Sequence, residues 1–223
     1  MSVRIEVAAD LQSVLHLGAV EIVNIDVQPA SEALRTFCDQ VAVGAVAESQ
    51  NEQWEKQCQE VRQMLRFGKF KASGRSKPAQ EYLLRCAVTD GKLPVINGPV
   101  DLLNAVSLSC NLPISLLSIS KCSEELWIDR AKAGEQFVFN SIGQVIELTD
   151  LITTYDRSCQ PPRPVGTPIK DSMAGKIEST DSHLIAIIYA PKNPAAIKRC
   201  HQAVELLADG MKSYCGTEET VKL

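Results

Sequence analysis

Alternating polar and apolar positions open the chain and predict two strands, at residues 3–8 and 19–27. Apolar residues at three- and four-residue spacing then predict two amphipathic helices, at about 30–48 and 52–66. The second of these helices has one continuous apolar face, formed by Trp54, Cys58, Val61 and Leu65. The first third of the chain therefore reads as two strands followed by a helical pair.

Two further helices follow a loop at residues 67–77, called the basic loop below. In the first of them Pro78 suits the first helical position, Ser76 or Lys77 is expected to cap it, and Gly91 to end it. Its inward positions are predicted to be Tyr82, Leu83, Cys86 and Ala87. The second helix is expected from Pro99 to Cys110, closed by Asn111.

The second half of the chain alternates short apolar runs with turn residues. Strands are predicted at 115–119, 125–130, 136–140, 144–149 and, as the strongest of the chain, 182–191. A proline-rich stretch at 159–168 is predicted to be a loop. A last helix is expected from about Pro194 to Met211, and the tail after Gly216 is expected to be frayed.

Helices and strands thus come in blocks, and tight turns join several of the strands. This order favours an α+β fold with a mixed or antiparallel sheet packed with helices over a doubly wound parallel sheet. No repeat or low-complexity linker marks a boundary, so one domain with an N-terminal extension is expected.

Composition narrows the function classes. Hydrophobic residues make up 45% and charged residues 22% of the 223 residues, which is ordinary for a globular protein. The net charge of −4 argues against general nucleic-acid binding, DNA included, but the basic loop still concentrates Lys69, Lys71, Arg75 and Lys77. No run of 18 apolar residues and no signal-peptide core is found, so a soluble cytoplasmic protein without membrane contact is expected.

The sequence contains neither a recognisable metal-site pattern nor one of the common enzyme motifs. The eight cysteines include no Cys-x-x-Cys pair and read as reduced, buried side chains, and the three histidines supply no zinc cluster. No metal and no cofactor is therefore expected. The chain also lacks a Walker loop, a Gly-x-Gly-x-x-Gly after a strand, a His-Glu-x-x-His and a Gly-x-Ser-x-Gly, which disfavours nucleotide hydrolysis, dinucleotide redox chemistry and elbow-type serine hydrolysis.

Several blocks, in a specific order, resemble a known family. They are GRSKPAQEYLLRCA with LPVINGPVDLLNAVSL, LPISLLSISK with AGEQFVFN, and GTPIKDSMAGKIESTDSHLIAIIYAP. Together they resemble the B3/B4 domain of the phenylalanyl-tRNA synthetase beta subunit in a free-standing form, over roughly residues 60–192. The resemblance implies a B3/B4-like domain at 60–192, an N-terminal part at 1–59 packed on it, and a C-terminal helix and polar tail at 193–223.

The same resemblance implies a function. In the synthetase this domain is the editing site, which hydrolyses tyrosine wrongly attached to the phenylalanine tRNA, because a single binding pocket discriminates weakly between similar side chains. A free-standing relative would be an aminoacyl-tRNA deacylase, a hydrolase whose partner is a tRNA acceptor end carrying an amino acid. The catalytic and anticodon-binding modules of a synthetase are not found here, so aminoacylation is not expected.

The family pattern Val-Asp-x-x-Asn-x-Val reappears as Val100, Asp101, Asn104 and Val106. The family's following Pro-x-His becomes Pro113, Ile114 and Ser115, so the editing histidine is replaced by a serine and the tyrosine specificity is not carried over. Hydrolysis can survive this change, because positioned water and oxyanion donors each lower the barrier by several kcal/mol, roughly.

Candidate substrate-binding residues each have a structural alternative. Arg75, Ser76 and Lys77 are candidates to bind the phosphate or ribose of the acceptor end, or form a solvated loop with Ser76 as a helix cap. Glu81 can order a water beside these charges or interact only with its helix dipole. A polar row on the next helix suits a pocket wall for an amino acid, or a buried network that stabilises the fold; it consists of Asn97, Asp101, Asn104 and Ser107.

Candidate catalytic residues are Asn104 from that row, Ser115, Lys170 and Asp171. Ser115 would donate to the substrate carbonyl, or be a structural strand serine. Lys170 would contact an anion or the oxyanion, and Asp171 would bind a water or the amino group, since both follow a Pro/Gly loop just before the strongest strand.

Two other functions stay open at this stage. One is a non-catalytic module that binds RNA or a free amino acid, and the loss of the histidine at Ser115 keeps it open. The other is a structural partner of a synthetase, which would purify together with it.

Overall fold

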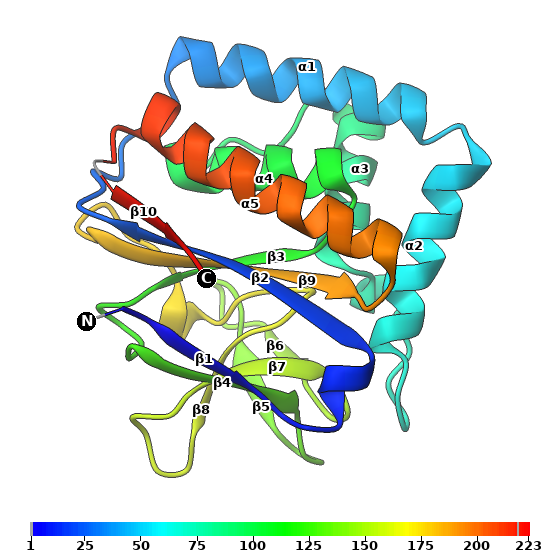
Figure 1. The fold of residues 1–223 in the computed structure, drawn as a ribbon, viewed down its shortest axis with the longest axis vertical. Coiled ribbons are helices and arrows are strands. Elements are labelled where there is room, and N and C mark those ends of the chain that lie inside the picture. The colour runs from blue at the N-terminus through cyan, green and yellow to red at the C-terminus, as the bar shows by residue number, and fades with distance from the viewer. Residues whose placement is uncertain (1, 218) are drawn as a thin grey trace.

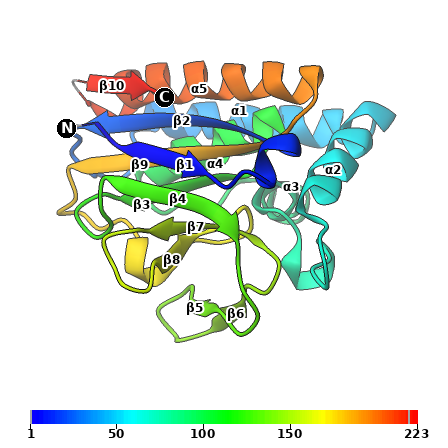
Figure 2. The ribbon, with the colours of Figure 1, turned by 60° about the horizontal axis from the view of Figure 1, so that its bottom comes forward.

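The computed structural model describes residues 2–217 and 219–223 and arranges them in layers (Figure 1). Helices cover one face of a four-stranded sheet, and a second four-stranded sheet lies against its other face. A separate two-stranded hairpin projects beyond the second sheet (Figure 2). The α+β class with sheets packed against helices is thereby confirmed.

The sheet under the helices has the order β10-β2-β9-β3 and is antiparallel throughout. Its strands are β2 (Leu15–Val23), β3 (Ile114–Ser118), β9 (His183–Pro191) and β10 (Glu219–Lys222). β9 pairs with a strand on each side and is covered on both faces, which explains why it reads as a continuous apolar run.

The second sheet has the order β1-β4-β7-β8, with β1 parallel to β4 and the other pairs antiparallel. Its strands are β1 (Arg4–Val7), β4 (Glu125–Arg130), β7 (Ile152–Asp156) and β8 (Arg163–Gly166). β5 (Gln136–Val138) and β6 (Val145–Glu147) form the projecting hairpin. Strands of the N-terminal segment pair with β4 and β9 from the middle and end of the chain.

The helices are α1 (Glu32–Glu48), α2 (Glu52–Leu65), α3 (Ala79–Asp90), α4 (Gly98–Cys110) and α5 (Pro194–Cys215). Short 3-10 turns are formed by Leu11–Ser13, Gly74–Ser76 and Met173–Gly175. The apolar face expected of α2 is confirmed, since its four residues are buried. α4 is buried almost all round because it lies among α1, α3 and α5.

Three expectations about strands are corrected. β7 has no counterpart in the sequence-based assignment, and β8 lies inside the proline-rich stretch predicted to be a loop. β8 carries Pro164 at the edge of its sheet, where a residue without an N–H is tolerated. The expected frayed tail is wrong as well, because β10 pairs with β2 and Leu223 exchanges both backbone hydrogen bonds with Ala19.

The start and inward face of α3 also differ from expectation. The helix begins at Ala79 with Pro78 in the cap position, and neither Ser76 nor Lys77 caps it by a side-chain hydrogen bond. Gly91 ends it with φ 69°, as expected. Tyr82 is 59% exposed and Cys86 is only half-buried, so those inward assignments are wrong. Gln80, Leu83 and Ala87 form the buried stripe, and the polar residue at its start obscures the pattern in the sequence.

No helix within the described part of the chain is both long and apolar enough to span a membrane. All eight cysteines are free, and those at 38, 58, 110, 122 and 200 are buried. Burial raises the pKa of the Cys38 thiol to about 11 and of Cys122 to about 12, so both stay protonated at neutral pH.

Candidate functional site

A tight turn at residues 166–171, called the Asp171 turn, carries two of the candidate catalytic residues. Thr167 closes it: its N–H and its hydroxyl both donate to the Lys170 carbonyl, at 3.1 and 2.8 Å, and its Oγ1 accepts from the Lys170 N–H at 3.0 Å. Gly166 and Asp171 then form an antiparallel bridge. The turn therefore fixes the backbone at Lys170 and Asp171 and brings the Asp171 side chain beside β3.

Asp171 sits in an environment that disfavours its charge. The Leu116 N–H of β3 donates to its Oδ2 at 3.1 Å, whereas its Oδ1 is buried and has no hydrogen-bond partner among the described residues. Burial raises the pKa of this carboxyl from 3.8 to about 7, against the opposing effect of the Ser115 hydroxyl and two backbone N–H groups. A carboxyl with such a pKa can exchange a proton at neutral pH.

Ser115 lies next to this carboxyl and belongs to a buried chain of hydroxyls. The Ser115 hydroxyl donates to the Thr167 carbonyl at 3.2 Å, and the Tyr189 hydroxyl donates to Ser115 Oγ at 3.2 Å. Tyr189 also shares a hydrogen bond of 2.8 Å with Thr154. A Ser115 rotation towards Asp171 would exchange one acceptor for another, because the hydroxyl has a single proton.

Gly166 provides the space in which Ser115 and Asp171 meet. A Cβ atom at this position would lie 2.9 Å from Asp171 Oδ1 and 3.2 Å from Ser115 Oγ. Any side chain here would crowd the unpartnered carboxylate oxygen, so the glycine keeps both polar groups accessible to each other. Segments of the chain 55 positions apart, at Leu116 and Asp171, are thus brought together by β3 and the Asp171 turn.

Two cations, Lys170 of the Asp171 turn and Arg75 of the basic loop, lie near each other. Lys170 Nζ is 3.4 Å from the centroid of the Phe139 ring, a cation–π contact. Burial first, and then the positive charge of Arg75, lower the pKa of Lys170. Neither Lys170 nor Arg75 forms an ion pair within residues 2–217 and 219–223. Adjacent cations without carboxylate partners suit an anionic ligand.

The basic loop is fixed at both of its ends. Gly68 has φ 48°, and a Cβ there would lie 2.2 Å from Asp150 Oδ2, which accepts the Lys69 N–H at 2.7 Å. At the other end the first N–H of α3, from Ala79, donates to the Pro168 carbonyl at 3.0 Å. The start of α3, two residues after the basic loop, is therefore tied directly to the Asp171 turn.

Glu81 and Lys77 are occupied by ion pairs. Arg62 binds Glu81 through two hydrogen bonds of 2.7 and 2.5 Å, and Lys77 Nζ lies 3.7 Å from the same carboxylate. The Glu81 side chain is only 6% exposed, so its charge is matched mainly by Arg62 of α2. Ser76 ends the 3-10 turn of the basic loop and is half-buried.

The polar row of α4 makes local hydrogen bonds. Asn97 caps the helix by accepting the Val100 N–H, Asp101 accepts the Ile96 N–H at 2.8 Å, and Ser107 donates to the Leu112 carbonyl at 2.7 Å. Asn104 is half-buried. These bonds connect α4 to its own flanking loops, and none of them joins the row to Ser115 or Asp171.

Two buried polar residues were not predicted from the sequence. Gln80 is fully buried, and neither its Oε1 nor its Nε2 has a hydrogen-bond partner in the described chain. Tyr189 lies in the most apolar strand and reads there as a core residue. The only signal for either is a single polar group inside an otherwise apolar stripe, which does not distinguish a site from a satisfied core group.

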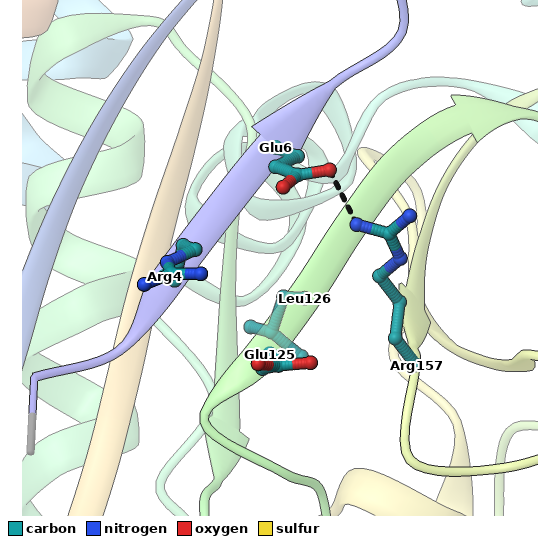
Figure 3. A pocket seen from close by; sticks show the side chains of 5 residues that line it. All are labelled: Arg4, Glu6, Glu125, Leu126 and Arg157. Carbon is teal, nitrogen blue, oxygen red and sulfur yellow. Dashed lines mark hydrogen bonds and ion pairs between the residues drawn. The ribbon is translucent and has the colours of Figure 1, made fainter.

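Two depressions lie elsewhere. One, of about 30 Å³, lies over β1 and β4 and is lined by Arg4, Glu6, Glu125, Leu126 and Arg157 (Figure 3). Arg157 pairs with Glu6 across it, and the space suffices for about one or two waters. The other, of about 170 Å³, lies between α1, α2 and α4 beside Trp54. Across the described residues, no group of three or more His, Cys, Asp and Glu side chains is placed to hold a metal ion.

Comparison with known proteins finds a structural similarity only, and it is weak. No protein-family model and no curated protein matches the chain. One solved structure that it resembles is an N-terminal fragment of the phenylalanyl-tRNA synthetase beta subunit from Pyrococcus horikoshii. The TM-score is 0.49 at 8% sequence identity, and the match covers 100% of this chain and 54% of the other. The chain thus spans about half the length of that fragment.

Proposed function

We propose that this protein is a free-standing aminoacyl-tRNA deacylase, which hydrolyses the ester between an amino acid and a tRNA acceptor end. The observation that carries the proposal is the half-buried Asp171 carboxyl, whose pKa burial raises to about 7 and whose unpartnered Oδ1 lies beside Ser115, on the turn that also carries Lys170. A general base is most effective when its pKa lies near the working pH. The block-wise sequence resemblance to an editing domain supports the choice of an acylated RNA end as substrate.

In the proposed reaction the Asp171 carboxylate takes a proton from a water as that water attacks the ester carbonyl carbon. The unpartnered Oδ1 is the oxygen with a free lone pair for this proton. The tetrahedral oxyanion is stabilised by Lys170, with the Ser115 hydroxyl as a second donor. The bond to the ribose oxygen then breaks, and protonated Asp171 returns its proton to that oxygen, giving free amino acid and tRNA.

The RNA contacts follow from charge and position. Arg75, Lys69 and Lys71 are exposed on the basic loop, which leads into α3, and the start of α3 is tied to the Asp171 turn by the Ala79–Pro168 hydrogen bond. A phosphate bound by these side chains would hold the acceptor end beside the carboxyl. The acidic net charge elsewhere on the protein would oppose binding of long nucleic acid away from this loop.

The direct test is release of labelled amino acid from a panel of correctly charged and mischarged tRNAs. We expect the purified protein to deacylate at least one mischarged tRNA at a rate that rises with pH and levels off above about 7. Asp171→Asn should lower the rate about 100-fold or more, because it removes the base. Lys170→Ala should also be slower, because it removes the proposed oxyanion contact.

Asp181→Asn is the matched control, since Asp181 is a buried aspartate outside the proposed site. It should leave the rate per folded molecule unchanged. Absence of release from every tRNA in the panel, or full activity of Asp171→Asn, would contradict the proposal.

A binding module without catalysis is the second candidate, and Gln80 is the observation that favours it. An amide with both polar atoms buried and unpartnered costs free energy unless a ligand or water satisfies it. Calorimetric titration with free amino acids distinguishes the two: saturable binding that Gln80→Leu weakens, without ester hydrolysis, identifies a binding module.

A further inference from the structure

The depression of about 170 Å³ lies where α1, α2 and α4 meet, near the corner at which α1 turns into α2 (Figure 1). None of its lining residues belongs to the Asp171 turn or to the basic loop. Val41, Ala45 and Trp54 give it apolar walls, whereas Gly44 and Glu48 are exposed and lie at its rim. A protein cavity of about 150 Å³ holds a benzene molecule, so this space suits a ligand of about six non-hydrogen atoms.

Gly44 widens the depression. A Cβ atom at this position would have no heavy atom within 4 Å, so packing does not require a glycine here. The residue lies inside α1, where glycine is less favourable than alanine. The effect of this glycine that the structure shows is therefore the open space beside it.

The rim of the depression is electrically negative. α1 ends at Glu48, and α4 ends one residue after Ser109, so two helix C-termini with partial negative charge border the space. Neither helix has a basic residue in its last turn, and Glu48 forms no ion pair in the part of the chain that is described. The start of α2, whose dipole has the opposite sign, carries Glu52 and Glu55. These surroundings favour a ligand with an ammonium group at the rim.

Trp54 forms the inner end of the depression, since it is only 5% exposed while the residues of the rim are exposed. Its indole N–H is buried and has no hydrogen-bond acceptor among the described residues. An unsatisfied buried donor costs free energy, and an oxygen atom of a ligand would satisfy it. A hydroxyl or carbonyl oxygen suits this place better than a carboxylate, because one donor leaves most of a carboxylate unpaired and the helix C-termini repel its charge.

We infer that this depression binds a small primary amine with an uncharged oxygen at its other end, such as an amino alcohol. The ammonium group lies beside Glu48, the hydrocarbon chain packs on Val41 and Ala45, and the oxygen accepts the Trp54 N–H. This ligand site is separate from the proposed deacylase site, because the two share no residue. The inference therefore stands or falls independently of the proposed function.

The test is an NMR titration of the isotopically labelled full chain with 4-aminobutan-1-ol. The chain has two tryptophans, so it gives two indole N–H signals, and the signal lost in Trp54→Phe belongs to Trp54. We expect the Trp54 signal to shift saturably, with a Kd of about 1 mM or lower, while the Trp127 signal stays in place. Butane-1,4-diol lacks the charge and pentylamine lacks the oxygen, so each should bind about threefold more weakly or worse.

Two variants with matched controls test the residues. Gly44→Leu fills the depression and should weaken binding at least about tenfold, whereas Ala47→Leu adds the same side chain to α1 outside the depression and should bind like the wild type. Glu48→Gln should bind about threefold more weakly, whereas Glu32→Gln, at the other end of α1, should have no effect.

Three results would overturn the inference. They are a Trp54 signal that does not shift saturably, an affinity for the diol or for pentylamine equal to that for the amino alcohol, and wild-type affinity in Gly44→Leu or Glu48→Gln. The ligand series uses the unchanged protein, so it decides the question even where a variant fails to fold.

Discussion

Replacing Asp171 by asparagine should remove the loss of stability that this carboxyl causes as pH rises, and with it the proposed base. The pKa of Asp171 is raised from 3.8 to about 7, so between these values the folded state holds a proton that the unfolded state has lost. Stability therefore falls as pH rises through this window and is constant above it. At about 1.4 kcal/mol per pKa unit the full loss approaches about 4 kcal/mol. Because the residue is partly exposed, we expect about 2–4 kcal/mol.

Asparagine keeps an oxygen that can accept the Leu116 N–H but does not titrate. The quantity to measure is the free energy of unfolding of Asp171→Asn minus that of the wild type, from urea denaturation at pH 4.5, 6 and 8. This difference should rise by about 2–4 kcal/mol from the lowest to the highest pH. Any constant cost of placing the amide cancels, because only the change with pH is used.

Asp181→Asn supplies a control, because the pKa of Asp181 is shifted in the opposite direction to that of Asp171. Hydrogen bonds from the Ser120 and Ser118 hydroxyls and the Glu178 N–H outweigh burial and lower the pKa of Asp181. Its charge therefore stabilises the fold above its unfolded pKa, and this contribution is lost only as pH falls through the lower folded value. Asp181→Asn should be less stable than the wild type throughout pH 4.5–8. A flat or falling difference for Asp171→Asn would refute the reasoning on which the proposed base depends.

Two further substitutions test the framework of the site. Gly68→Ala should lower the free energy of unfolding by about 1–3 kcal/mol, since φ is positive and the new methyl would meet Asp150; a chemical melt that matches the wild type would disprove this. Tyr189→Phe should cost about 1–2 kcal/mol, because its hydroxyl bonds both Ser115 and Thr154. If Ser115 serves catalysis, the same variant should also slow deacylation, and an unchanged rate would separate the hydroxyl chain from the reaction.

The period of apolar residues is sufficient to predict a helix or strand where one face of that element is uniformly apolar. α2 and β9 follow their predicted spans closely, because burial alone decides which of their residues turn inward. Periodicity fails to predict a strand where the local residues favour a turn or loop but pairing with a distant strand decides the structure. The prolines around β8 are turn signals in sequence, yet an edge position next to β7 accepts them. β10 is polar and short, and only its pairing with β2 makes it a strand.

Some residues of the candidate site are predictable from the sequence, but their environment is not, because it depends on contacts between distant segments. Ser115 is singled out where the family pattern has a histidine, and Asp171 by its place after a Pro/Gly loop, and the fold places the Asp171 carboxyl beside Ser115 and Leu116. The elevated pKa of Asp171 is not predictable, since it depends on the burial of one oxygen by a turn and a strand that are distant in sequence. Gln80 is equally hidden, because its burial depends on how α3 lies against α1 and α4.

The pairing of β10 with β2 has a consequence for self-association. β10 occupies hydrogen-bonding groups of β2 from Val20 to Val23, a stretch that is mostly buried and apolar. An uncovered strand edge of this kind is a template for a second copy of the same chain. Proteolytic removal of the residues after Gly216 would therefore expose an apolar strand edge that is a template for domain swapping or aggregation, and the short polar strand β10 covers it.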